Sequence, residues 1–297
     1  MRIERHADGV DVQAPAKVNL FLEVLGKRPD GYHEIATLMC AVSLFDTLEL
    51  RHDESGEVRL SCDLPGLETG AGNLVCQAAA VLRRHSGCTR GARLHLKKRI
   101  PLAAGLAGGS SDAAAALAGL NELWQLGLSA AELARLGAEV GSDVAFFFAT
   151  PAAWCTGRGE IVTPAPVGRT LDLLLLCPGV GLPTASVYRG VTVPDQPADG
   201  ADIRQALAVG DVEQLGGLLH NRLQLPAEQL CPEVAAWQAR LTALQPAGAA
   251  MSGSGSSLFA LCRDRQEALR IARELSSQPL GWNTAGGPNL VLVQSCV

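Results

Sequence analysis

The chain has 297 residues, 47% of them hydrophobic and 19% charged, a balance typical of a globular protein long enough for two domains. A formal net charge of -5 and few aromatic residues (four Trp, two Tyr and six Phe) provide neither a basic surface nor a stacking platform, which argues against nucleic acid as a partner. No apolar run approaches the ~20 residues of a membrane helix, no secretory signal opens the chain and the nine cysteines contain no Cys-x-x-Cys pair, so we expect a cytoplasmic protein without membrane contact, disulfide framework or structural zinc.

Residues 14–24 have the alternating pattern of a half-buried strand. The alternation places Val18, Leu20, Leu22 and Val24 on one face and Lys17, Asn19, Phe21 and Glu23 on the other. Lys17 and Asn19 then present an ammonium and an amide in the same direction, toward one ligand or toward solvent. A turn over residues 28–31 follows, and after it Tyr32 and His33 either pack as a corner or offer ring edges to a planar ligand.

The next segments predict regular structure on the way to a glycine-rich loop. Residues 48–50 and 58–60 are typical of a hairpin, residues 73–84 of a helix that starts at Asn73, and residues 92–98 of a strand. Lys97 and Lys98 point to opposite faces of that strand, so at most one of them serves the loop that follows.

Residues 101–117 read PLAAGLAGGSSDAAAAL, a glycine-rich loop that opens a helix. Glycines let the backbone approach a ligand closely, and the unpaired N–H groups of a helix's first turn attract phosphate. Ser110, Ser111 and Asp112 are good helix-starting residues, and the two hydroxyls are also candidate magnesium ligands. The loop is neither a P-loop nor a dinucleotide fingerprint, and a flexible linker before a helix is the alternative interpretation.

Two helices and a candidate base follow the loop. We expect one helix to end near Gly127 and a second to run from the capping box of Ser129 and Glu132 to Gly141. Asp143 then precedes an apolar run, where its carboxylate either caps a short helix or accepts a substrate proton.

The rest of the chain predicts a second domain after a Pro-Gly cluster at 163–168. Before it, residues 154–162 predict a strand with a bulge or a close backbone approach. After it, we expect strands at 171–177, 257–262 and 290–293 and helices at 184–188, 202–208, 212–219, 232–244 and 266–275. A second glycine-serine loop, residues 251–256, is either a flexible hairpin or part of a phosphate site shared with the first loop.

Three of these segments, 15–20 (PAKVNL), 101–111 and 251–256, resemble in order and position the motifs of the GHMP kinases, named for galactokinase, homoserine kinase, mevalonate kinase and phosphomevalonate kinase. Within that superfamily, residues 30–34, 141–144, 177–180 and 183–184 look most like the branch that phosphorylates the 2-hydroxyl of a methylerythritol bearing a cytidine diphosphate, on the methylerythritol phosphate route to isoprenoids. The resemblance spans nearly the whole chain.

The resemblance implies an α+β fold of two domains with the active site in the cleft between them. The first, residues 1–165, would be ribosomal-protein-S5-like and bind ATP; the second, residues 166–297, would be ferredoxin-like. It also implies ATP with magnesium as cofactors, a small-molecule substrate, and a monomer or weak homodimer.

The resemblance also implies a role for each matching residue. Asp143 would take the proton of the attacking hydroxyl, and Lys17 would hold that carboxylate ionised and offset charge on the transferred group. The substrate would be bound by Asn19, Tyr32, His33, Thr184 and Tyr188. The nucleotide would be bound by Asn73, Lys98, Pro101, Leu102, Ala103, Ala104, Gly105, Leu106, Ala107, Gly108, Gly109, Ser110 and Ser111; no residue is assigned as a metal ligand.

The chain departs from the superfamily pattern at two places. Ala103 and Ala107 stand where glycine is common, which requires a negative φ there, and residues 221–224 read NRLQ where the family often shows NDLE. Two other functions stay open: a different GHMP kinase acting on homoserine, mevalonate or a sugar, and a nucleotide-binding protein without transferase activity.

Overall fold

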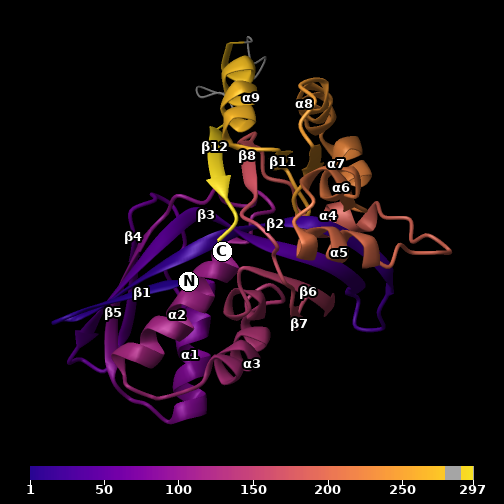
Figure 1. The fold of residues 1–297 in the computed structure, drawn as a ribbon. Helices are drawn as coiled ribbons and strands as arrows, with labels where there is room; N and C mark the ends of the chain where they lie inside the picture. The colour runs from indigo at the N-terminus through magenta and orange to yellow at the C-terminus, as the bar shows by residue number, and fades with distance from the viewer. Residues whose placement is uncertain (278–288, 297) are drawn as a thin grey trace.

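The computed structural model describes residues 1–277 and 289–296 and contains two β-sheets flanked by helices (Figure 1). The larger sheet has the strand order β1-β2-β3-β5-β4, formed by β1 (Arg2–His6), β2 (Gly9–Lys27), β3 (His33–Asp53), β5 (Gly91–Lys97) and β4 (Val58–Cys62). It is extended by β6 (Ala152–Gly157) on β3, β7 (Ile161–Pro164) on β6 and β9 (His220–Asn221) on β2. The fold is α+β, as predicted.

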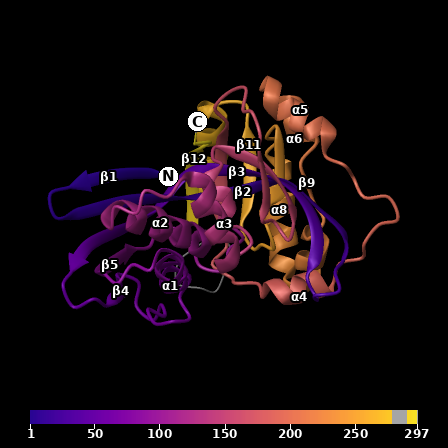
Figure 2. The ribbon, with the colours of Figure 1, turned by 90° about the horizontal axis from the view of Figure 1, so that it is seen from below.

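Three helices cover one face of the larger sheet: α1 (Leu74–Ser86), α2 (Gly108–Leu123) and α3 (Ala130–Val140). Figure 2 shows them over the sheet, with α5 (Ala201–Val209), α6 (Val212–Gly217) and α8 (Pro232–Ala243) beyond it to one side. The alanine-rich α2 approaches the sheet closely: a Cβ on Gly119 would lie 2.6 Å from Leu50 Cδ1. Small side chains on α2 are therefore a packing requirement.

The smaller sheet is antiparallel throughout, with the order β10-β11-β8-β12, formed by β10 (Gly248–Met251), β11 (Leu258–Cys262), β8 (Asp172–Cys177) and β12 (Asn289–Gln294). The apolar run of β8 is buried on both faces: Leu173 and Leu175 face the core shared with the larger sheet, and Leu174 and Leu176 face a second core. That second core is closed by the helices α4 (Thr184–Arg189), α7 (Gln224–Leu230), α8 and α9 (Arg265–Ser277).

The second half of the chain returns to the larger sheet twice. Strand β9 pairs with β2, and the backbone N–H of Cys296 donates to Ala41 O. The predicted boundary at residues 165 and 166 lies between β7 and β8, and the division there stays a prediction. Residues 278–288 and 297 of the predicted second domain lie outside the described residues.

Most predicted elements are confirmed within one to three residues, including the start of a helix at Asn73 and the Ser129–Glu132 capping box of α3. The hairpin predicted from residues 48–50 and 58–60 is wrong, because β5 inserts between β3 and β4. Residues 154–162 form two strands joined by a turn instead of one bulged strand. The sequence analysis did not predict β1, β9, β10 or α7.

The strand over residues 14–24 is confirmed as part of β2, but its predicted alternation fails after Asn19. A register shift against β3 makes Leu20 an extra residue, and such a bulge moves later side chains to the opposite face. Leu22 therefore lines the same cavity as Lys17 and Asn19, while Phe21 packs with Val18. Both faces of the strand are buried, so the solvated face considered for Lys17 and Asn19 is excluded.

Candidate active site

Two adjoining cavities, of about 510 and 780 Å³, share Arg158, Thr184 and Tyr188 and together form one cleft. The first cavity contains Lys17 and Asp143 together with most of the glycine-rich loop, and the second contains Tyr32 and His33. Residues from both halves of the chain line the first cavity, including Gly253 and Ser254 of the second glycine-serine loop. The two glycine-rich loops therefore do meet at one site.

Lys17 lies on β2 with its side chain only 3% exposed. Its Nζ donates to Asn19 Oδ1 at 2.6 Å and to the carbonyl oxygen of Gly105 at 2.8 Å. Burial lowers the pKa of Lys17, and the nearby Asp143 carboxylate opposes that effect. The predicted juxtaposition of Lys17 and Asn19 is confirmed, with the ammonium held in a fixed direction.

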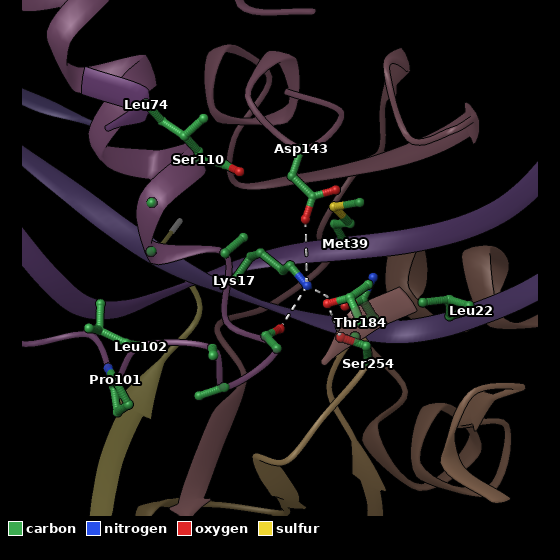
Figure 3. Close-up of a pocket in the computed structure, with 18 of the residues that line it drawn as sticks. Lys17, Leu22, Met39, Leu74, Pro101, Leu102, Ser110, Asp143, Thr184 and Ser254 are labelled. Atoms are coloured by element: carbon green, nitrogen blue, oxygen red, sulfur yellow. Dashed lines mark hydrogen bonds and ion pairs between the residues drawn. The ribbon is translucent and has the colours of Figure 1, made fainter. Parts of the chain in front are cut away.

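Asp143 lies between α3 and the 3-10 helix η1 (Ala145–Phe148) and points toward Lys17 (Figure 3). Its Oδ2 lies 3.9 Å from Lys17 Nζ. The N-cap position of η1 is Val144 and carries no side-chain capping bond, so the alternative in which Asp143 caps a helix is wrong. The turn between β6 and β7 reaches over this carboxylate: a Cβ on Gly159 would lie 3.3 Å from Asp143 Oδ1.

The glycine-rich loop is held in left-handed backbone conformations. Ala103 and Ala107 have φ values of 50° and 55°, so the expectation of negative φ at these alanines is wrong. Gly105, at φ 75°, packs its backbone on the second loop, and a Cβ there would overlap Ser252 O. Left-handed alanines cost roughly 1–2 kcal/mol each, so the surrounding contacts must impose this loop shape.

Helix α2 begins earlier than predicted, at Gly108, with Ala107 as an N-cap that has no side chain to cap it. Ser110, Ser111 and Asp112 therefore lie inside the helix, beyond its cap position, instead of capping it. The first-turn N–H groups lack carbonyl partners one turn earlier and carry the positive end of the helix dipole. Gly108, Gly109 and Ser110 line the cavity, so these amides border the space where phosphates are expected.

The predicted nucleotide residues fall into two groups. Nine of the eleven loop residues line the first cavity, whereas Leu106 and Ser111 are buried beneath it. Asn73 is committed to capping α1, where its side chain accepts from Val75 N, and the neighbouring Leu74 lines the cavity instead. The structure thus gathers most of the predicted cradle but directs the Asn73 amide elsewhere.

Lys98 also lines the cavity, yet its ammonium is bound to two carboxylates. It contacts Asp46 and lies 2.7 Å from Asp112 Oδ2, and all three side chains are at most 4% exposed. Burial would lower the pKa of Lys98, but the two carboxylates outweigh it and raise the pKa. Burial, with Asp46 nearby, raises the pKa of Asp112 to about 7. The cluster fixes the start of α2 against β3.

The second cavity is an aromatic pocket. The His33 and Tyr188 rings are stacked with centroids 5.1 Å apart, while Tyr32 is 54% exposed. Burial, with Lys27 nearby, lowers the pKa of His33, so its ring is neutral near pH 7 and offers one donor and one acceptor. Thr184 Oγ1 lies 3.0 Å from Ser254 Oγ and joins this pocket to the second loop (Figure 3).

Arg158 was not predicted as a site residue, yet it is the cation shared by the two cavities. It lies on the turn between β6 and β7, its guanidinium carbon is 4.9 Å from the Tyr32 ring centroid, and its Nε is 3.5 Å from Glu160 Oε1. The sequence signal for this turn was the pair of flanking glycines, Gly157 and Gly159, because such a pair favours a tight turn between strands. Both glycines have positive φ in the structure.

No helix among residues 1–277 and 289–296 is both long enough and apolar enough to cross a membrane. Within the same ranges no group of three or more His, Cys, Asp or Glu side chains is arranged to hold a metal ion.

Comparison with known proteins matches two family models to this chain. The model described as "GHMP kinases N terminal domain" matches residues 73–150, and that described as "GHMP kinases C terminal" matches residues 203–279. The first match covers α1, the glycine-rich loop, α2 and Asp143, and the second begins in α5 and includes the 251–256 loop. The predicted two-domain GHMP architecture is confirmed.

Three similar proteins carry one name. A 4-diphosphocytidyl-2-C-methyl-D-erythritol kinase from Shouchella clausii is 42% identical over 261 residues, 88% of each chain. One from Symbiobacterium thermophilum is 43% identical over 270 residues, 90% of this chain and 95% of that one. A crystal structure of a 4-(cytidine 5'-diphospho)-2C-methyl-D-erythritol kinase is 34% identical with a TM-score of 0.77, covering 96% of this chain and 98% of that one. The chain belongs to the GHMP kinases and, within them, to the 4-diphosphocytidyl-2-C-methyl-D-erythritol kinase family.

Proposed function

We propose that this chain transfers the γ-phosphate of ATP to the 2-hydroxyl of 4-diphosphocytidyl-2-C-methyl-D-erythritol, with Asp143 as the general base and Lys17 as the stabilising cation. The chain is an ATP-dependent small-molecule kinase, as its family membership establishes. One observation carries the assignment of residues: the Lys17–Asp143 pair lies in a cavity bordered by the glycine-rich loop and continuous with the aromatic pocket of His33 and Tyr188.

Phosphoryl transfer to a hydroxyl requires a proton acceptor and positive charge near the reacting oxygens. Asp143 is partly exposed at 29%, so an acceptor hydroxyl can approach its oxygens directly. Lys17 Nζ lies 3.9 Å from Asp143 Oδ2 and would place positive charge near the oxygen from which the proton leaves. Its two hydrogen bonds, to Asn19 and Gly105, fix the direction of the ammonium before substrate binds, so little reorganisation is needed during transfer.

The glycine-rich loop and the start of α2 would hold the ATP phosphates through backbone N–H groups. Magnesium, which supplies charge neutralisation between the phosphates, suits oxygen ligands. Ser111 Oγ and Asp112 Oδ1 are buried near the start of α2 without a hydrogen-bond partner, but neither residue lines the cavity. Ser110 does line it, so its hydroxyl and the phosphates are the oxygens that would hold the ion.

The acceptor would extend from Asp143 into the aromatic pocket. Arg158 lies where the two cavities join, so we assign it to the substrate's diphosphate, which needs a cation between the sugar and the base. The neutral His33 ring would hydrogen-bond the cytosine edge, with Tyr32 and Tyr188 against the base and Thr184 beside it. Asn19, whose amide nitrogen donates to Thr37 Oγ1 at 2.8 Å, would help to orient the methylerythritol hydroxyls.

The test is release of ADP from ATP and magnesium with a panel of acceptors: the diphosphocytidyl methylerythritol, methylerythritol phosphate, mevalonate, homoserine and galactose. We expect turnover only with the cytidylated compound. Turnover with a different acceptor would keep the kinase chemistry and overturn the pocket assignment. Binding of ATP without turnover of any acceptor would favour a nucleotide-binding protein.

Tyr32→Ala tests the base pocket separately, because it removes an exposed ring that no described core contact requires. We expect the KM for the cytidylated acceptor to rise and the KM for ATP to stay unchanged. An unchanged acceptor KM would remove Tyr32 from the pocket.

A further inference from the structure

Behind the second glycine-serine loop lies a buried polar segment that the proposed chemistry does not use. Residues 220–224, which begin with β9, run beside β2 just past Lys17 and Asn19: His220 pairs with Phe21, Asn221 pairs with Leu22, and Arg222 N donates to Leu22 O at 2.8 Å. Within the NRLQ stretch, Arg222 and Gln224 depart from the family pattern NDLE, whereas Asn221 matches it.

Glu23 of β2 anchors this segment. Its carboxylate is fully buried and accepts two hydrogen bonds from Arg222, Nε to Oε1 at 2.7 Å and a second to Oε2 at 2.8 Å, with His220 Nε2 at 3.2 Å from Oε2. Burial alone would raise the pKa of Glu23, but Arg222 and two backbone N–H groups outweigh it and lower the pKa. The pair therefore stays charged and holds the backbone on both sides of Asn221 against β2.

From this fixed position, Asn221 hydrogen-bonds the second glycine-serine loop. It is buried, and its Nδ2 donates to Met251 O at 2.7 Å and to Gly253 O at 2.8 Å, while its Oδ1 accepts from Leu223 N at 2.9 Å. Only the amide nitrogen can face two carbonyl oxygens, so the orientation of the side chain is determined. Both hydrogens of the amide are committed to residues that flank Ser252.

Ser252 connects the second loop to Lys17 through Gly105. Its Oγ donates to Gly105 O at 2.9 Å and accepts from Asn19 N at 3.3 Å. Gly105 O is also the carbonyl that accepts from Lys17 Nζ. The second loop also packs closely on Lys17, because a Cβ on Gly253 would lie 3.1 Å from Lys17 Nζ. A shift of the second loop therefore moves the oxygen that directs the ammonium.

We propose that Asn221 is a positioning residue for phosphoryl transfer: by holding the carbonyls of Met251 and Gly253, it fixes Ser252 against Gly105 and thereby directs Lys17 toward Asp143. The proposal rests on the proposed function and deepens it. It assigns to a buried amide that does not itself line the cavity part of the precision with which the charge at the reacting centre is placed.

The test uses the isosteric variant Asn221→Asp, which keeps the acceptor for Leu223 N but replaces the donating nitrogen by an oxygen that repels both carbonyls. We expect kcat to fall by about 10- to 100-fold, with the KM values for ATP and acceptor within about threefold of wild type, because only transition-state placement is lost. If Asn221→Asp does not fold, Asn221→Ala removes the amide without adding charge. It should show the same fall in kcat with nearly unchanged KM values.

Gln238→Glu is the matched control. Gln238 also donates its amide nitrogen to a carbonyl of β10, Ala249 O at 2.8 Å, so the exchange of amide for carboxylate disturbs the same hairpin away from the cavity. We expect a lowered Tm with wild-type kcat. If both variants lower Tm alike and neither changes kcat, Asn221 is structural only and the proposal is overturned. A raised KM for ATP with unchanged kcat would overturn it as well.

A double-mutant cycle tests the route through Ser252. Because Asn221 acts by holding that residue, Asn221→Asp combined with Ser252→Ala should lose no more kcat than the more damaging single variant. Losses that multiply would show two independent effects and refute the route. Wild-type turnover of the same acceptor is measured first, so that a failure of the proposed function, seen as an inactive wild type, is distinct from a failure of this inference, seen as an active variant.

Discussion

Lys17 and Asp143 approach to 3.9 Å between Nζ and Oδ2, although one lies on strand β2 and the other on the short connection after α3. Lys17 makes its shorter contacts with Asn19 and Gly105, at 2.6 and 2.8 Å, so the pair is held apart at a distance that leaves the carboxylate free to accept a proton. Two predictions depend on this arrangement, a third concerns the surrounding loop, and a fourth concerns the cation shared by the two cavities.

Asp143→Asn should fold and bind ATP but lose transfer, because an amide cannot accept the proton of the attacking hydroxyl. We expect kcat to fall by about 10²- to 10⁴-fold, the usual contribution of a general base. Steady-state ADP release and ATP titration calorimetry measure the two properties. Asp195→Asn, an exposed aspartate outside both cavities, is the control. Wild-type turnover by Asp143→Asn would remove Asp143 as the base.

Lys17 should set the alkaline limb of the activity profile. Its pKa is lowered from the ordinary 10.5 by burial, so it loses its proton, and the site its positive charge, at a lower pH than a free lysine does. Activity should therefore decline with rising pH before 10.5 is reached.

Lys17→Arg provides the comparison, since a guanidinium stays charged throughout this range. The residual activity of this variant should not decline where that of wild type does, as measured by kcat against pH with circular dichroism as the check on folding. An identical alkaline limb in both proteins would assign the titration to a different group.

How much was predictable depends on the range of the interactions. The helix start at Asn73, the capping box at Ser129 and the shared direction of Lys17 and Asn19 are set by residues within a few positions of one another, and all three are confirmed. The placement of β5 between β3 and β4 is a choice among distant partners, which a hairpin-like spacing cannot reveal.

The same contrast between local and long-range interactions holds for the candidate site. The strand pattern left open which of Lys97 and Lys98 serves the loop, and the family resemblance selected Lys98, which does line the cavity. Its partners Asp46 and Asp112 come from β3 and α2, so its binding to two carboxylates was not visible in the sequence. The bulge at Leu20 likewise depends on the register against β3. Arg158 was missed because its importance arises only where two cavities join.

Ala107→Gly should stabilise the protein. Ala107 has φ 55°, and removing its Cβ relieves roughly 1–2 kcal/mol of left-handed strain while adding some freedom to the unfolded chain, for a net gain of about 0.5–1 kcal/mol. Ala131→Gly, an exposed position in the helix α3, should lose about 1 kcal/mol by the same substitution. Thermal unfolding of both variants measures the signs, and a destabilised Ala107→Gly would contradict the argument.

Arg158→Gln should separate acceptor binding from chemistry. Hydrogen bonds between a guanidinium and a phosphate contribute about 1.5–3 kcal/mol, so the KM for the cytidylated acceptor should rise by roughly 10- to 100-fold. Because we assign Arg158, the cation shared by the two cavities, to the acceptor's diphosphate, the KM for ATP should remain unchanged. Arg59→Gln, an exposed arginine on β4, is the matched control.

Arg158→Gln should also lose part of the salt dependence of acceptor binding, because one ionic contact is gone. If kcat falls instead while the acceptor KM stays constant, Arg158 acts on the transferred phosphoryl group and the diphosphate assignment is wrong.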